Sequence, residues 1–261
     1  MRRSIVLAAV AGLVLAGPAY AQVQPLTFPA PVQTMPGGTD YAAVLASPIR
    51  TDEDRARDEA RMTAETLSFT GVQPGWKVGD MIIGGGYFTR IFSAAVGPGG
   101  HVTAWQPAEF IGFQASYGEA LTAADALANV DAVSVSLAEP ELPTGQDLVF
   151  TAQNYHDLHL GMAAADTASK VNAAVFDALR PGGLYVIVDH HAVAGSDLAA
   201  ADSLHRIDIE AVKREVAAAG FVLEAESDLL ADPADPLTAS VFDPSIRGKT
   251  SQFMLRFRKP T

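Results

Sequence analysis

A glycine-rich segment that joins an apolar run to a helical pattern constrains this chain more than any other feature. The apolar run Met81–Ile83 is typical of a buried parallel strand, and Gly84, Gly85 and Gly86 follow it directly. Three glycines allow the backbone to turn sharply and to approach a ligand where a Cβ atom would collide. The free N–H groups at the start of the next helix then point at whatever lies over the glycines. This order of elements predicts a nucleotide-type ligand in an α/β protein, with an ordinary tight turn as the alternative.

The first 21 residues have the pattern of a secretory signal peptide. Arg2 and Arg3 form a charged start, an apolar stretch covers residues 5–16, and the small residues Ala19 and Ala21 frame a cleavage site. An apolar stretch of about 12 residues is too short to cross the roughly 30 Å core of a bilayer. We therefore expect a periplasmic or secreted protein with no stable membrane anchor after cleavage, and an uncleaved anchor is the alternative.

The remaining length suits one domain that follows a short arm. Residues 22–40 contain four prolines and the pair Gly37-Gly38, which predicts an extended arm. Residues 41–261 are long enough for one α/β domain with a large core, and we expect this domain to start with a helix.

That first helix is predicted over residues 51–69, where Thr51 and Asp54 resemble a capping box. Its charged side chains are spaced as i,i+4 pairs, which is typical of a solvated face. The alternative is that Arg50, Arg57 and Arg61 line a binding site.

Composition excludes several classes of function. The chain has 18 basic and 30 acidic side chains and a formal net charge of −12, which argues against a partner made of nucleic acid or anionic lipid. It has no cysteine, which excludes disulfides, thiolate zinc sites and a cysteine nucleophile. Neither nucleic acid nor a membrane surface is therefore expected as the partner.

Strand and helix patterns alternate after the glycine segment. Further strands are predicted at 101–105, 132–137, 147–152, 184–188, 221–226 and 252–258. Further helices are predicted over 113–127, 166–179 and 208–219. This alternation predicts an α/β fold with a doubly wound, mostly parallel sheet.

Several motifs carry a resemblance to a known family. The pattern Asp80-x-x-x-Gly84-x-Gly86 after a strand resembles the first motif of class I S-adenosylmethionine-dependent methyltransferases. The turn 180–183 (RPGG) before the fifth strand is placed like a turn of that fold. Four further motifs are similar to an exported bacterial group of predicted methyltransferases, and they lie at 154–157, 188–190, 242–244 and 247–249. The resemblance implies a Rossmann-like methyltransferase fold whose seven-stranded sheet ends in an antiparallel strand, and S-adenosylmethionine as the cofactor.

The resemblance also implies which residues contact the cofactor. The glycines would pass under its methionine part, Gln106 would hold the ribose, and Glu139 would lie at the adenine. The candidate cofactor-binding residues are Asp80, Gly84, Gly85, Gly86, Gln106, Glu139 and Asn154.

This sequence departs from the family pattern at three positions. Ile82 stands where a further glycine is usual, and Gln106 stands where an acid usually binds the ribose hydroxyls. Ala138 occupies the place of an acid near the adenine, so Glu139 takes that role by default, and Glu109 is an alternative partner for the ribose.

Five of the six histidines map to the carboxyl edge of the predicted sheet, where open α/β sheets bind ligands. We call this set the histidine rim, and it consists of His156, His159, His190, His191 and His205. A hydrogen-bonded structural network is the alternative for each member. The candidate catalytic residues at this edge are Tyr155, His156, Asp157 and His190.

The rim allows two kinds of chemistry. A histidine or Asp157 could remove a proton from a substrate hydroxyl or amine while a methyl group is transferred. Imidazoles could instead hold a divalent metal together with Asp157 or Asp189. The spacing matches no zinc signature, so we assign no metal ligand from the sequence.

Together these features predict an exported S-adenosylmethionine-dependent methyltransferase that acts on a small molecule. One alternative is an exported binding protein of the same fold that has lost the cofactor. The other alternative is a metal-dependent enzyme that uses the histidine rim.

The signal peptide leads to a direct test. Cleavage after Ala21 should leave Gln22 as the first residue, because small side chains at Ala19 and Ala21 fit the cleavage site. Mass spectrometry of the secreted protein checks this. An intact species that starts at Met1 in the membrane fraction would contradict it.

Overall fold

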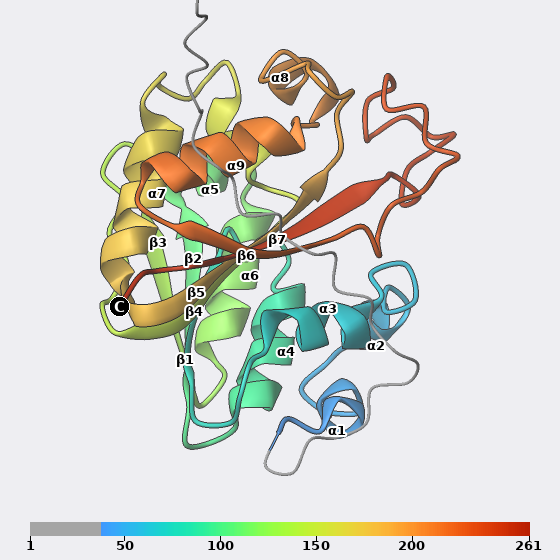
Figure 1. Ribbon diagram of the computed structural model, residues 1–261. Coiled ribbons are helices and arrows are strands. Elements are labelled where there is room, and N and C mark those ends of the chain that lie inside the picture. Colours follow the sequence, from blue (N-terminus) through green and yellow to red (C-terminus); the bar gives the residue numbers. More distant parts are fainter. Residues whose placement is uncertain (1–37) are drawn as a thin grey trace, which may run out of the picture.

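A computed structural model describes residues 38–261 of the chain (Figure 1). The predicted signal peptide and almost all of the predicted arm lie outside the described residues. In the described part, no helix is long and apolar enough to cross a membrane.

The centre of the molecule is a seven-stranded sheet with the order β3-β2-β1-β4-β5-β7-β6. Its strands are β1 (Lys77–Met81), β2 (His101–Pro107), β3 (Val130–Val135), β4 (Gln146–Ala152), β5 (Leu179–His190), β6 (Val222–Ser227) and β7 (Gln252–Arg258). Strand β7 is antiparallel to both of its neighbours, and the other pairs are parallel. The structure confirms the predicted doubly wound sheet and its antiparallel last strand.

Helices cover both faces of the sheet (Figure 1). One face packs against α1 (Tyr41–Leu45), α3 (Thr63–Thr70), α4 (Tyr87–Val96) and α6 (Ser116–Asp125). The other packs against α5 (Ala108–Phe113), α7 (Thr167–Ala178) and α9 (Ile209–Ala218). Short helices α2 (Asp52–Arg55), η1 (His156–His159) and α8 (Ala201–Leu204) complete the set.

The central strands are apolar on both sides because both of their faces are covered. In β4, Leu148 and Phe150 enter one hydrophobic core, and Val149 enters the core on the opposite face. In β5, Val186 and Ile187 divide between the two cores in the same way. Alternate residues of a strand point to opposite faces, so a continuous apolar run is what a doubly covered strand requires.

The predicted helix over residues 51–69 is wrong as a single element. Met62 has a left-handed backbone with φ 40°, and this residue separates α3 from the turns that follow α2. The capping box of Thr51 and Asp54 is present at the start of α2. Arg55 pairs with Asp52 at 3.0 Å instead of the residue four positions later.

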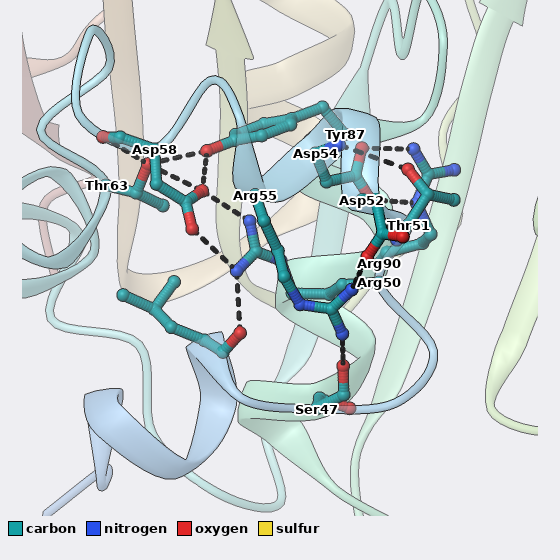
Figure 2. A network of polar contacts seen from close by, with 11 residues as sticks. Ser47, Arg50, Thr51, Asp52, Asp54, Arg55, Asp58, Thr63, Tyr87 and Arg90 are labelled. Atoms are coloured by element: carbon teal, nitrogen blue, oxygen red, sulfur yellow. Dashed lines mark hydrogen bonds and ion pairs between the residues drawn. The ribbon is translucent and has the colours of Figure 1, made fainter.

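The segment before the sheet is tied to the helix that follows the glycine turn (Figure 2). The Arg90 guanidinium on α4 donates to both carboxylate oxygens of Asp54, at 2.6 Å each, and also to the carbonyl of Gly85 at 3.2 Å. Tyr87 at the start of α4 donates to Asp58 at 2.6 Å. The N-terminal segment thus fixes the position of the turn between β1 and α4.

The ligand edge of the sheet follows from the strand order. The order runs one way from β1 through β2 to β3 and the opposite way from β4 to β5, so the direction reverses between β1 and β4. Ligands of open α/β sheets bind beyond the carboxyl ends of the strands at this reversal. The glycine turn leaves β1 at this point.

The clamp between Arg90 and Asp54 can be tested by removing one partner. Arg90→Met should lower the free energy of unfolding by about 3 kcal/mol, because a carboxylate that is almost fully buried loses its partner. The control is Arg55→Met, which breaks an exposed pair in the same segment and should cost less than about 1 kcal/mol. Urea unfolding measures both changes, and equal changes would show that the clamp does not support the turn.

Candidate functional site

The predicted strand Met81–Ile83 is placed too late in the chain, because β1 ends at Met81 and both Ile82 and Ile83 belong to the turn. Alternate residues of this turn have a glycine-type backbone. Ile82, Gly84 and Gly86 all have positive φ, at 60°, 55° and 74°. A Cβ added at Gly84 or Gly85 would meet no atom within 4 Å, so the space above the turn is open. The turn therefore offers room for a ligand next to exposed backbone, as the sequence predicts.

Ile82 holds a conformation that favours glycine. A β-branched residue in the left-handed region is strained by about 1–2 kcal/mol. Its N–H donates to the carbonyl of Trp105 at 2.8 Å, and its carbonyl accepts from the Asn154 side chain at 2.9 Å. The sequence has Ile82 where the family pattern has a glycine, but the backbone of Ile82 adopts the left-handed conformation that favours glycine.

Gln106 and Asn154 hold the turn by hydrogen bonds to its backbone. Gln106 is fully buried, and its Oε1 accepts from the N–H of Gly84 at 3.0 Å. Its Nε2 is buried without a hydrogen-bond partner. Asn154 donates to the carbonyls of Ile82 and Ala152 and also lines the cavities described below.

Neither Glu139 nor Glu109, the two acids considered for the adenosine part of the cofactor, has a carboxylate free at the cavities. Glu139 is exposed and does not line the described cavities. Glu109, the alternative partner for the ribose, accepts hydrogen bonds from Ser136 Oγ at 2.6 Å and Leu137 N at 3.1 Å. Its carboxylate is thus used to hold the end of β3.

Asp80 lies in β1 beneath the turn and is buried. Its Oδ2 accepts from Thr89 Oγ1 at 2.5 Å. Burial raises the pKa of Asp80 to about 7, against the effect of the hydrogen bond from Thr89 and of the charges on Arg61 and Arg90. The carboxyl group therefore titrates near neutral pH at the floor of the site.

Three adjoining cavities lie over this edge of the sheet. The smallest, 150 Å³, lies over the glycine turn. The largest, 610 Å³, lies over the histidines, and a third of 450 Å³ lies beside it. Gln153, which follows β4, lines all three. The cavities together can take an extended ligand.

Gln153 was not among the predicted site residues. It has a positive φ of 63°. Its side chain accepts from Arg61 at 3.0 Å and donates to Gln252 at 3.0 Å. Its place directly after the β4 strand, next to Asn154, is the signal that could have found it.

Arginines line the two smaller cavities. Arg57 and Arg61 line both of these cavities, and Arg247 lines the 450 Å³ cavity and the 610 Å³ cavity. Within residues 38–261 none of the three has a carboxylate partner. Burial, and then the neighbouring charge of Arg57, lowers the pKa of Arg61 to about 10. This part of the site suits an anionic group.

Two of the three arginines proposed from the sequence therefore reach the site. The third, Arg50, pairs with Asp58 away from the cavities (Figure 2). Arg61 also lies over the ring of Tyr87, 4.7 Å from its centroid.

The histidine rim divides into two groups. His156, His190 and His205 line the 610 Å³ cavity. His159 contacts Glu215 at 3.0 Å, and His191 packs against the ring of Phe253. All five histidines lie near the carboxyl edge of the sheet, as predicted from the strand ends. The side chains of His159 and His191, however, do not line the 610 Å³ cavity.

His156 is buried between two carboxylates. Its Nδ1 lies 2.8 Å from Asp189 Oδ1, and its Nε2 lies 3.1 Å from Asp157 Oδ1. Burial opposes the charged form, but the two carboxylates outweigh it and raise the pKa of His156 to about 10. Burial also opposes ionisation of Asp157, yet hydrogen bonds from His156 and His205 lower its pKa. In the absence of other ligands the pair is charged at neutral pH.

His190 has the opposite character. It is buried, and its Nδ1 lies 2.8 Å from Thr250 Oγ1. Burial lowers its pKa to about 4, against the attraction of Asp189. His190 is therefore an uncharged imidazole at neutral pH, at the wall of the two larger cavities.

Tyr155 is a correction to the predicted catalytic set. Its side chain is fully buried and lies in the core under α7 and α9. The hydroxyl donates to Glu215 at 2.9 Å and accepts from Asn172 at 2.8 Å. Both hydrogen-bonding functions are used inside the protein, so Tyr155 packs and does not face the cavity.

Comparisons with known proteins show the fold. No protein-family model matches this chain, and no curated protein matches it. An S-adenosylmethionine-dependent methyltransferase from Aquifex aeolicus aligns with a TM-score of 0.53 at 18% identity, over 84% of this chain and 98% of its own. A second, from Mesorhizobium loti, aligns with a TM-score of 0.51 at 16% identity, over 75% of this chain and 97% of its own.

The cyclase SpnF aligns with a TM-score of 0.54 at 17% identity, over 80% of this chain and 81% of its own. These likenesses show that the chain has the class I fold of S-adenosylmethionine-dependent methyltransferases. One fold can host several reactions, so the reaction must be argued from the site.

The raised pKa of Asp80 predicts a pH-dependent stability. Between the ordinary value of 3.8 and about 7, the folded protein binds a proton that the unfolded chain has released. Stability must therefore fall as pH rises through this window. Asp80→Asn cannot ionise and still offers an oxygen to Thr89, so its stability relative to wild type should grow with pH by at most about 1.4 kcal/mol per unit. Urea unfolding at pH 4, 5.5 and 7 measures this, and a difference that does not change with pH would contradict it.

Proposed function

We propose that this protein is an S-adenosylmethionine-dependent methyltransferase that acts on a small molecule. The observation that carries the proposal is the open turn of Gly84 and Gly85 at the reversal point of the sheet, where an added Cβ meets nothing within 4 Å. The fold shared with methyltransferases supports it. The glycine-type backbone at Ile82 supports it further.

The residues near the turn fit the methionine part of the cofactor. That part carries a carboxylate and an ammonium group. Arg57 and Arg61 line the 150 Å³ cavity without carboxylate partners among the described residues, and they suit the carboxylate. Asp80 at the floor of the same cavity suits the ammonium group.

The ribose end fits less closely. The Oε1 of Gln106 is already bonded to Gly84, and Glu139 is exposed. We therefore assign cofactor binding to Asp80, Arg57, Arg61 and the glycine turn. Asn154 acts by positioning this turn.

When bound, S-adenosylmethionine supplies a methyl group by in-line displacement at its sulfonium, and positioning of the acceptor provides much of the rate. An acceptor that keeps a proton needs a base at the cavity wall. His190 is uncharged at neutral pH and lines the cavity, so it is the group that can accept a proton there. His156 is already protonated between its two carboxylates and cannot act as that base.

The cavity dimensions favour a small acceptor. A volume of 610 Å³ lies within the range of about 300–1,000 Å³ that is usual for small-molecule sites. Its wall includes apolar side chains such as Phe110, Met162 and Phe242 beside the histidines. We propose export to the periplasm or the medium on the sequence pattern of residues 1–21 alone.

Cofactor binding can be tested with a matched pair of glycine variants. Gly85→Val should abolish binding of S-adenosylmethionine in calorimetric titration, because its side chain would fill the open space above the turn. Gly99→Val is the control, since its added Cβ also meets nothing within 4 Å but lies outside the cavities. Both variants should keep the circular dichroism spectrum of the wild type.

Two results would reject the proposal. One is a wild-type protein that fails to bind S-adenosylmethionine or S-adenosylhomocysteine at millimolar concentration, which would favour a binding protein that has lost the cofactor. The other is equal binding by the Gly85→Val and Gly99→Val variants, which would place the cofactor away from the turn.

A further inference from the structure

Three atoms of the kind that bind metals converge at the wall of the 610 Å³ cavity. They are Nε2 of His156, Oδ1 of Asp157 and Nδ1 of His205. The separations are 3.1 Å from His156 to Asp157, 3.2 Å from His156 to His205, and 3.5 Å from His205 to Asp157. His156 and Asp157 come from η1, and His205 follows α8, so two distant segments build the cluster.

These separations match one triangular face of a metal coordination sphere. Metal bonds to imidazole nitrogen and carboxylate oxygen are about 2.0–2.2 Å long. With angles between those of an octahedron and a tetrahedron, neighbouring ligand atoms lie about 3.0–3.5 Å apart. One ion at the centre of the three atoms would therefore need little movement of the side chains.

The orientation of His156 is fixed from behind. Asp189 is fully buried, and its two oxygens contact the ring Nδ1 at 2.8 Å and the backbone N–H of His156 at 2.7 Å. A carboxylate that accepts the Nδ1 proton leaves the Nε2 lone pair directed at the cluster. Histidines that bind metals in proteins are almost always held in this way.

His205 reaches the cluster from a strained backbone. It has a left-handed φ of 53°, a conformation that non-glycine residues seldom adopt. Its ring also packs edge-on against Phe242, with centroids 4.7 Å apart. The surrounding structure thus holds the imidazole in place against a backbone preference, as is common at functional sites.

We propose that His156, Asp157 and His205 bind one divalent first-row transition-metal ion, with Asp189 as the residue that positions His156. Two imidazoles and one carboxylate suit zinc, iron(II), manganese, cobalt or nickel, and they do not suit copper(I) or calcium. The coordination positions that remain face the cavity. There the ion would hold and polarise an oxygen of the small molecule. This role rests on the proposed function, but the existence of the metal site does not.

Cobalt is the probe, because its visible absorption reports the ligand set directly. The full chain, made without an affinity tag, is stripped with a chelator and titrated with Co²⁺ in the absence of S-adenosylmethionine. Wild type should bind one equivalent and develop absorption bands that Zn²⁺ removes by competition. His205→Ala and Asp157→Asn should each weaken Co²⁺ binding at least tenfold, since each removes one ligand of three.

The control is His159→Ala. His159 lies in the same short helix but contacts Glu215 and does not line the cavity, so its loss should leave Co²⁺ affinity unchanged. Asp189→Asn should weaken Co²⁺ binding by about 10- to 100-fold and alter the absorption bands, as expected of a positioning residue. Circular dichroism checks that each variant is folded.

The proposal fails if the stripped wild type binds no Co²⁺ at one equivalent, which would leave a proton shared among His156 and the carboxylates in place of the ion. It also fails if His205→Ala and Asp157→Asn bind Co²⁺ as tightly as His159→Ala. The stripped wild type is also titrated with S-adenosylmethionine. Binding of S-adenosylmethionine without binding of Co²⁺ rejects the metal site alone, and the reverse result rejects the proposed function alone.

Discussion

The constraint on which the site depends is the reversal of the chain between β1 and α4, which requires three left-handed residues within five positions. Such a turn is not stable alone, and three parts of the molecule hold it. Gln106 from β2 accepts the N–H of Gly84, Asn154 after β4 donates to the carbonyl of Ile82, and Arg90 donates to the carbonyl of Gly85. The space above Gly84 and Gly85 stays open, since a Cβ added at either glycine meets no atom within 4 Å. Strain at Ile82 is thus balanced by a set of contacts that also shape the ligand site.

The charges around this turn are arranged unevenly in a chain that is acidic as a whole. Most basic side chains of the described residues are paired with carboxylates, whereas Arg57, Arg61 and Arg247 face the cavities without one. The wall of the 610 Å³ cavity carries His156, Asp157 and His205, and Arg247 lines this cavity as well. Such an acidic chain repels anions over most of its surface, so the free arginines form a local exception. The 150 Å³ cavity with Arg57 and Arg61 thus suits an anion, and the wall of the 610 Å³ cavity at His156, Asp157 and His205 suits a proton or a metal ion.

The fold could be predicted from the sequence because its signals are local. Apolar runs and their alternation with helices predicted the succession of strands and helices, since central strands covered on both faces are mostly apolar. The antiparallel last strand followed from the family resemblance. The apolar run Met81–Ile83 misplaced β1, which contains Lys77 and Asp80 and ends at Met81. The break at Met62 could not be predicted, because a left-handed φ at a methionine is imposed by tertiary contacts and has no residue preference behind it. For the site, the ends of the predicted strands indicated which residues lie at the carboxyl edge of the sheet. They did not indicate the direction in which each side chain points. Tyr155 therefore proved to be packed in the core, Glu139 proved to be exposed, and Gln153 was missed.

Solved structures that share this fold include both methyltransferases and a cyclase, so the architecture by itself leaves the reaction open. The boundary between the cavities indicates which kind of reaction the site suits. A transfer reaction needs its two reacting atoms about 3–3.5 Å apart, which requires that donor and acceptor sites share a boundary. Here the cavity over the glycine turn and the cavity over the histidines both border Gln153 and Asn154. Asn154 donates to the carbonyl of Ile82 in the turn, and Gln153 accepts from Arg61, so hydrogen bonds to the turn and to Arg61 hold this boundary. A group bound over the glycines and a group bound at His190 would therefore meet beside Gln153 and Asn154, which is the arrangement that group transfer requires and that a simple binding protein does not.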